Sequence, residues 1–231
     1  MFPARAELID TRRGEFHNAP AISRGPERAM NDRATIKNRL RRLLDPCVSF
    51  LFKAGVTPIG VTIAGLILSF AGAFAIARGE LVAGGALLVL SGVCDTLDGS
   101  LARRSGKDSV FGAFIDSTID RAAELASFGA LIVYYVSREG SSRFAVPLAV
   151  AALAGSFLTS YTRARAEGLG LDCRVGLLER PERVALLVLG LLFGEKALFA
   201  VIAILAVLTL VTTIQRIVHV YRSTSGKGLS A

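Results

Sequence analysis

Four of the five aspartates between residues 95 and 120 are spaced so that they could act together, and the segment is bordered on both sides by long apolar sequence. They form two pairs with spacings of three and four residues, and either spacing puts both side chains on one face of an α-helix. A short basic segment with a glycine separates the pairs, so two antiparallel helices could direct all four carboxylates to one point. Two carboxylates about 5.5 Å apart repel by roughly 3 kcal/mol at an effective dielectric of about 20. Four must therefore protonate, pair with basic groups or bind metal. They are Asp95, Asp98, Asp116 and Asp120.

The residues around these aspartates favour divalent cations and a diphosphate. Carboxylates are hard oxygen ligands, which select Mg²⁺, Mn²⁺ or Ca²⁺ over zinc. Four of them match two divalent ions in charge, and a paired-metal site stabilises both the attacking and the leaving oxygen in a displacement at phosphorus. Gly99 and Gly112 leave room for a ligand near the helix backbones, and Arg103 could hold a phosphate oxygen. The sequence thus predicts two divalent cations, Mg²⁺ or Mn²⁺, at a diphosphate site.

The rest of the chain is apolar enough to lie in a membrane. Its 231 residues are 52% hydrophobic, with a mean hydropathy of +0.51. Several blocks approach the roughly 20 apolar residues that span a bilayer, which favours a membrane protein over a very apolar soluble helical core. We predict an all-α integral membrane protein with six transmembrane helices. The expected helices cover residues 57–77, 82–103, 111–136, 145–166, 183–194 and 197–219; the fifth is short for a span.

The basic residues predict how the chain is oriented. The net charge is +8, and 11 of the 27 Lys and Arg residues lie in the first 53 positions. Connections rich in arginine alternate with connections that carry one or two basic residues, which six spans explain and an odd number does not. Both termini and the aspartates then face the cytoplasm, in a multi-pass protein of the cell membrane. No segment resembles a motif that binds nucleic acid, so the positive charge indicates anionic lipid.

The N-terminal part divides into two regions. Residues 1–30 have little apolar periodicity and predict a disordered leader. Residues 31–54 alternate apolar and basic positions at helical spacing, which predicts an amphipathic helix lying in the membrane interface; a solvated charged helix is the alternative. Residues 55–222 would then form the six-helix catalytic domain, and residues 223–231 a cytoplasmic tail.

The aspartate segment resembles the signature of the CDP-alcohol phosphotransferase family. That signature is D-x-x-D-G-x-x-A-R, then eight residues, then G-x-x-x-D-x-x-x-D, and all eight fixed positions are matched between Asp95 and Asp120. A weaker resemblance extends over residues 35–220. It implies a six-helix membrane enzyme, usually a homodimer, which moves a phosphatidyl or similar group from a CDP-linked donor such as CDP-diacylglycerol to an alcohol and releases CMP.

The resemblance also implies roles for individual residues. Asp95, Asp98 and Asp116 would be metal ligands, and Asp120 would bind the second metal and act as general base. The CDP moiety and its diphosphate would contact Gly99, Arg103 and Ser109. The nucleotide would pack near the segment Pro58, Ile59, Gly60 and Val61. The pair Thr57-Pro58 is also an ordinary helix start, with Thr as the N-cap and Pro as the first helical residue.

The connection after residue 160 bears on the acceptor. Arg163 and Arg165 end one apolar helix and Arg183 begins the next, so their guanidinium groups could converge on a phosphate; a solvated, positive-inside loop is the alternative. The strings RARAE-x-x-G and ERPER resemble those of phosphatidylinositol phosphate synthases, which implies inositol 1-phosphate as the acceptor. Glycerol 3-phosphate, the acceptor of phosphatidylglycerophosphate synthases, is the main alternative; serine as the acceptor and an archaeal-type lipid as the donor are the others.

Other functional classes fit the pattern less well. An ion or proton transporter would spread its carboxylates along a pore, whereas these four are expected near one membrane face beside an arginine. A prenyl-transferring enzyme also uses aspartates and Mg²⁺, but with another spacing. A metal-free scaffold would need the carboxylates to pair with Arg103, Arg121 and other cations. The full match to the metal-binding pattern argues against it.

Overall fold

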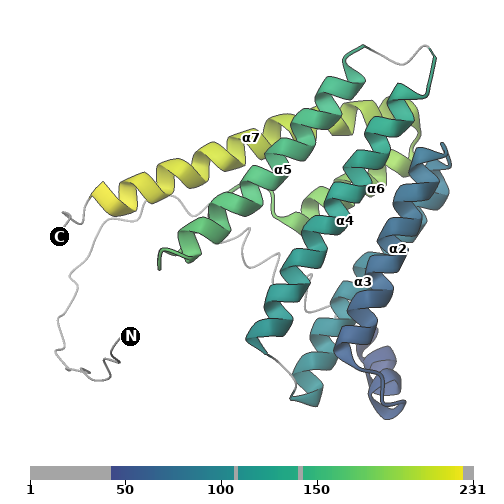
Figure 1. Cartoon of the computed structure of the whole chain (residues 1–231), viewed down its shortest axis with the longest axis vertical. Coiled ribbons are helices and arrows are strands. Elements are labelled where there is room, and N and C mark those ends of the chain that lie inside the picture. The colour runs from purple at the N-terminus through teal and green to yellow at the C-terminus, as the bar shows by residue number, and fades with distance from the viewer. Residues whose placement is uncertain (1–42, 107–108, 140–142, 226–231) are drawn as a thin grey trace, which may run out of the picture. The chain divides into compact units, whose positions relative to one another are not determined.

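The structure is a computed structural model that describes residues 43–106, 109–139 and 143–225. Every regular element in these ranges is a helix (Figure 1). Residues 44–53 are helical, while the predicted leader, much of the predicted interfacial helix and the last six residues of the tail lie outside the described residues. The six later helices are α2 Pro58–Ala77, α3 Leu81–Ser105, α4 Val110–Val136, α5 Ala145–Glu167, α6 Arg180–Leu192 and α7 Glu195–Ser225.

These bounds agree with the predicted ones to within a few residues, except that α7 continues six residues beyond the expected end at residue 219. Polar caps explain where several helices begin. The Thr57 hydroxyl accepts a hydrogen bond of 3.2 Å from the Gly60 amide, and Pro58 is the first helical residue of α2. A Glu179–Glu182 capping box begins α6. Each cap satisfies amide groups that have no partner within the helix.

Four helices are long and apolar enough to cross a membrane, namely α2, α3, α5 and α7. The helix α4 has 27 residues but carries several charged side chains near its start. At 13 residues, α6 is shorter than the roughly 20 residues that a perpendicular span needs. Large apolar side chains also point outward along one face of α2, at Ile59, Ile63 and Ile67. The chain is therefore an all-helical membrane protein with four candidate spans among its described residues.

Glycines allow the closest helix contacts. A Cβ atom added to Gly84 of α3 would lie 3.0 Å from the Gly72 carbonyl oxygen of α2. The helices α5 and α7 lie side by side (Figure 1), and a Cβ on Gly155 would be only 2.2 Å from the Thr209 hydroxyl. Small residues at such positions let helix backbones approach each other in lipid. Gly129 is different, because a Cβ there would meet nothing within 4 Å.

We therefore expect opposite effects from two identical substitutions. Gly155→Ala should lower stability by about 1–3 kcal/mol, because the added methyl group overpacks the α5–α7 contact. Gly129→Ala should be neutral or raise stability by up to about 1 kcal/mol, since alanine favours a helix over glycine. Thermal unfolding of the two detergent-purified variants measures both effects. An equal change in thermal stability in the two variants would contradict the close approach of α5 and α7.

Two clusters of buried side chains hold the helices together. The larger one joins all six helices. Its members include Ile76, Leu88, Leu131, Ala149, Leu191 and Leu205. The smaller one consists of Val48, Val61 and Leu101, which come from residues 44–53, α2 and α3. A hydrogen bond of 2.7 Å from Arg104 to the Ser49 hydroxyl reinforces this second contact. The helical segment before α2 is thus fixed to the end of α3 that carries the aspartates.

Candidate functional site

The connection between α3 and α4 brings the two aspartate pairs together. Gly106 ends α3 in the left-handed conformation, with φ 62°, where a residue without a Cβ is favoured. The Ser109 hydroxyl caps α4 by accepting a hydrogen bond of 2.9 Å from the Gly112 amide. Carboxylate oxygens of three aspartates lie within 4.8 Å of one another. The three are Asp95, Asp116 and Asp120.

Asp98 is not among these three. Its side chain is only 6% exposed and accepts a hydrogen bond of 2.7 Å from the Thr62 hydroxyl of α2. Thr62 also donates to the Pro58 carbonyl oxygen, so Asp98 is linked to the first turn of α2. Nothing in the local sequence around Thr62 indicates this contact, because a threonine in an apolar helix most often hydrogen-bonds its own backbone.

The cluster of three fits a divalent cation. Its donors are hard carboxylate oxygens from two helices, the set that Mg²⁺ and Mn²⁺ prefer. The cluster also holds a cationic group of the protein itself. A guanidinium nitrogen, Nη1 of Arg180, lies 2.6 Å from Asp120 Oδ1 and 3.6 Å from Asp95 Oδ1. The carboxylates of the cluster are therefore partly neutralised by a cationic side chain, as they would be by a bound metal.

The residues predicted to contact the donor lie in the first turn of α2, in α3 and at the start of α4. Ile59 and Gly60 are exposed in the first turn of α2, whereas Val61 is buried against Leu101. The guanidinium of Arg103 is exposed and lies 3.5 Å from the position of a Cβ on Gly99. The absence of a side chain at residue 99 thus leaves space beside Arg103. The hydroxyl of Ser109 is engaged as the cap of α4.

A small basic cavity adjoins the aspartate cluster. Its volume is about 80 Å³. Five arginines and one glutamate contribute to its wall, which therefore carries a formal charge of +4. Arg163 and Arg183 were expected at such a site, while Arg165 is exposed and does not line the cavity. The lining residues are Arg121, Ser160, Arg163, Glu179, Arg180, Arg183 and Arg216.

A buried ion pair holds Arg183 in the cavity wall. Its Nε and Nη2 donate to the two carboxylate oxygens of Glu124 at 2.9 and 3.2 Å. The Ser156 hydroxyl donates to the same carboxylate at 2.6 Å. Arg183 is 2% exposed and Glu124 is 8% exposed. Glu124 continues the four-residue spacing of Asp116 and Asp120 along α4, a signal that could have identified it from the sequence.

Two other cavity arginines are held by different partners. Arg163 donates to Glu167 at 2.9 Å, in an ion pair that is partly exposed. Arg216, in the apolar helix α7, donates to the Val175 carbonyl oxygen at 2.9 Å and to the Thr159 carbonyl oxygen. These partners fix the guanidinium groups while the cavity keeps its excess of positive charge. Sequence reasoning did not identify Arg216, although an arginine in an apolar helix is a signal of function.

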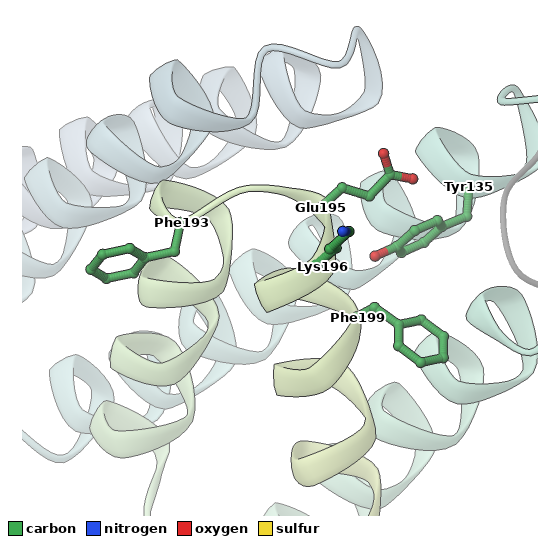
Figure 2. Close-up of a pocket in the computed structure, with 5 residues that line it drawn as sticks. All are labelled: Tyr135, Phe193, Glu195, Lys196 and Phe199. Atoms are coloured by element: carbon green, nitrogen blue, oxygen red, sulfur yellow. The ribbon is translucent and has the colours of Figure 1, made fainter.

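A larger cavity of about 550 Å³ lies at the other end of α4. Figure 2 shows its lining side chains, which come from the ends of α4 and α6 and from the start of α7. Tyr135 follows Asp120 by 15 residues, so this cavity is about 22 Å from the aspartate cluster along the helix. With a single carboxylate, it lacks the ligands of a metal site. Its lining residues are Tyr135, Phe193, Glu195, Lys196 and Phe199.

Comparisons with known proteins bear on the aspartate cluster and the basic cavity. The profile of the CDP-alcohol phosphatidyltransferase family matches residues 56–221. An archaetidylinositol phosphate synthase of Methanothermobacter thermautotrophicus is 36% identical over 155 residues, which are 67% of this chain and 74% of that protein. A phosphatidylinositol phosphate synthase of Streptomyces avermitilis is 39% identical over 147 residues, 63% of this chain and 60% of that protein.

Solved structures show the same relationship. The crystal structure of Mycobacterium tuberculosis phosphatidylinositol phosphate synthase with CDP-DAG bound superimposes with a TM-score of 0.72 at 34% identity, covering 78% of this chain and 94% of that one. The same enzyme in complex with manganese and citrate gives a TM-score of 0.71. The family profile covers more than half of the chain and includes all four aspartates. The chain therefore belongs to the CDP-alcohol phosphatidyltransferase family.

Proposed function

We propose that this enzyme transfers a phosphatidyl group from CDP-diacylglycerol to inositol 1-phosphate, giving phosphatidylinositol phosphate and CMP. The observation that carries the proposal is the position of the basic cavity, which shares Arg180 with the aspartate cluster. A phosphate-bearing alcohol in the cavity would present its hydroxyl group near Asp120. The names of the relatives support inositol phosphate as the acceptor. The Mycobacterium tuberculosis phosphatidylinositol phosphate synthase, which was crystallised with CDP-DAG, supports the donor.

Divalent cations, Mg²⁺ or Mn²⁺, bound by the four aspartates would neutralise the diphosphate and stabilise the attacking and leaving oxygens. The manganese complex of the Mycobacterium tuberculosis enzyme supports this assignment. Asp95, Asp116 and Asp120 would supply the clustered ligands. Asp98, oriented by the Thr62 hydroxyl, would complete the set from its buried position.

Asp120 is proposed as the general base. The acceptor hydroxyl oxygen forms a bond to the phosphorus that carries the diacylglycerol, and the hydroxyl proton passes to Asp120. The bond from that phosphorus to the oxygen shared with CMP breaks, and CMP leaves with this oxygen and its electron pair. A carboxylate positioned within hydrogen-bond reach of the hydroxyl can perform this transfer. Arg103 would hold an oxygen of the diphosphate, which orients the phosphorus for attack.

The remaining donor contacts are proposed for the start of α2 and for the α3–α4 connection. Ile59 and Gly60 are exposed in the first turn of α2 and could contact the nucleotide, along with the adjacent Pro58 and Val61. Gly99 would give the diphosphate access to α3. Ser109 would contribute through the start of α4, where its hydroxyl fixes the first turn.

The acceptor phosphate is assigned to the basic cavity. Arg163 and Arg183 line it, and Arg216 and Arg121 add positive charge. Arginine guanidinium groups suit a phosphate because they donate several hydrogen bonds in a fixed plane. Arg165, which is exposed outside the cavity wall, would contribute only through long-range attraction.

The arrangement in the membrane is also a proposal. Six spans, with α4 and α6 crossing beside the four apolar helices, would put both termini and the active site on the cytoplasmic side of the cell membrane. The charged start of α4 and the short α6 are then accommodated because both face the site. Residues 31–54 would form the interfacial helix, residues 1–30 a leader and residues 223–231 a tail. As in the family generally, the enzyme is proposed to form a homodimer.

The acceptor is tested by release of CMP. Purified enzyme with CDP-diacylglycerol and Mn²⁺ should release CMP when inositol 1-phosphate is added and much less with glycerol 3-phosphate or inositol. The same reaction without metal, or with free phosphate in place of an alcohol, is the control. Equal or faster release with glycerol 3-phosphate would change the acceptor assignment. No release with any alcohol, from folded protein, would exclude the proposed transfer reaction.

A further inference from the structure

Arg180 contacts the aspartate cluster and also lines the basic cavity. Its Nη1 atom contacts Asp120 and Asp95, at 2.6 and 3.6 Å, in the predicted metal site. Its side chain also lines the basic cavity, together with Arg163, Arg183 and other arginines. Among the described residues, it is the only one that both contacts the aspartate cluster through an ion pair and lines this cavity beside Arg183. Arg180 is therefore the physical link between the two sites.

The contact with the aspartates competes with metal binding. Arg180 contacts Oδ1 atoms of two residues in the cluster, and a divalent cation would bind carboxylate oxygens of the same two residues. A guanidinium and a divalent cation held a few ångströms apart also repel each other strongly. Arg180 in this position therefore competes with a divalent cation for the carboxylates of the cluster.

The guanidinium is not fully satisfied in this position. The Nε atom of Arg180 is buried and has no hydrogen-bond partner among the described residues. Buried donors without an acceptor are rare and call for an explanation. An anion in the adjacent cavity would supply the missing acceptor. Because Arg180 is the first residue of α6 and its backbone is fixed by the Glu179–Glu182 capping box, its long side chain can change direction without moving the helix.

We infer that Arg180 is a positioning residue that couples metal loading to acceptor binding. In the metal-free enzyme its guanidinium balances the charge of Asp95 and Asp120. When metal binds, the guanidinium leaves the cluster and contacts the acceptor's phosphate in the basic cavity. The inference rests on the proposed function, because it takes the cluster as the metal site and the cavity as the acceptor site. It adds that the acceptor site is complete only after metal has bound.

Coupling of this kind is reciprocal. If metal raises the affinity for the acceptor's phosphate, the phosphate raises the affinity for metal by the same factor. Removing the side chain of Arg180 should have two effects. The metal should bind more tightly in the absence of acceptor, because its competitor is gone. The factor by which the phosphate and the metal raise each other's binding affinity should fall.

The test measures binding of Mn²⁺ to the full-length, detergent-purified enzyme by calorimetry, with and without inositol 1-phosphate. No CDP-lipid is present, so no turnover occurs. In the wild type we expect inositol 1-phosphate to tighten Mn²⁺ binding by at least about 5-fold, the lower end of typical couplings. In Arg180→Gln, Mn²⁺ alone should bind several-fold more tightly than in the wild type, and the effect of inositol 1-phosphate should fall to within about twofold. Arg174→Gln makes the same charge change at an exposed side chain and should behave as the wild type does.

The outcomes separate this inference from the proposed function. If the wild type fails to bind Mn²⁺, or fails to bind inositol 1-phosphate in its presence, the proposed function itself is wrong. If both bind but neither affects the other in the wild type, the role of Arg180 is overturned, and this comparison needs no variant. Unchanged or weaker Mn²⁺ binding in Arg180→Gln, or coupling equal to that of the wild type, would also overturn it. A purely structural arginine would not produce tighter metal binding when it is removed.

Discussion

Asp120→Asn should abolish turnover while leaving the binding of CDP-diacylglycerol nearly unchanged. The substitution keeps the size of the side chain but removes both its negative charge and its capacity to accept a proton. Loss of a general base alone costs roughly 10²–10⁴-fold in rate, and Asp120 is also proposed as a metal ligand, so we expect a loss at the upper end of this range. Steady-state release of CMP measures the rate, and equilibrium binding of a labelled CDP-lipid measures the affinity.

An exposed aspartate provides the matched control. Asp172→Asn makes the same chemical change at a side chain that is 76% exposed, with one exposed partner in Arg174, and should retain wild-type activity. If Asp120→Asn instead weakens CDP-lipid binding as much as it lowers the rate, the role of Asp120 is to hold metal and donor together. If the variant retains most of its activity, the general base is another group.

The positions of the clustered aspartates were predictable because the α3–α4 connection is local. Spacings of three and four residues fix which side chains share a helix face, and Gly106 and Ser109 favour a tight turn between two helices. Three of the four carboxylates accordingly lie within 4.8 Å of one another. Asp98 is outside this group and accepts a hydrogen bond from Thr62. That contact depends on how α2 packs against α3, which the spacing of the aspartates does not encode.

The helix bounds were predictable for a similar reason. In a sequence apolar enough to lie in a membrane, long apolar blocks ended by glycine, proline or charged residues leave few alternative positions for the helix ends. The composition could not determine whether α4 and α6 cross the membrane, since one carries charged side chains and the other has 13 residues. Which helices span depends on how neighbouring helices cover those charges, which is a property of the packed structure.

The arginines were the least predictable part of the site. The positive-inside rule alone accounts for a loop rich in arginine. The sequence of the loop therefore does not distinguish Arg165, which is exposed, from Arg183, which is buried. The difference comes from Glu124 on α4, a residue 59 positions away in the chain. The role of Arg180 was equally hard to predict, because its contacts with Asp95 and Asp120 join α6 to α3 and α4.

Glu124→Gln should strongly impair acceptor binding although Glu124 does not line the basic cavity. The substitution leaves the buried guanidinium of Arg183 without its charged partner. Breaking a buried ion pair by changing one partner costs about 3–5 kcal/mol, so we expect a large loss of thermal stability. We also expect the KM for inositol 1-phosphate to rise at least about 10-fold, because Arg183 loses its fixed orientation. The KM for CDP-diacylglycerol should change little.

Two further variants separate stability from binding in this prediction. Glu139→Gln makes the same change at an exposed residue after α4 and should alter neither quantity. The double variant Glu124→Gln with Arg183→Met removes both charges, so it should regain much of the lost stability, because an apolar replacement of a buried pair is often nearly neutral. It should not regain affinity for the acceptor, since the guanidinium itself is gone. Recovery of both stability and acceptor affinity would show that Arg183 does not bind the acceptor's phosphate, and that the Glu124–Arg183 pair only joins α4 to α6.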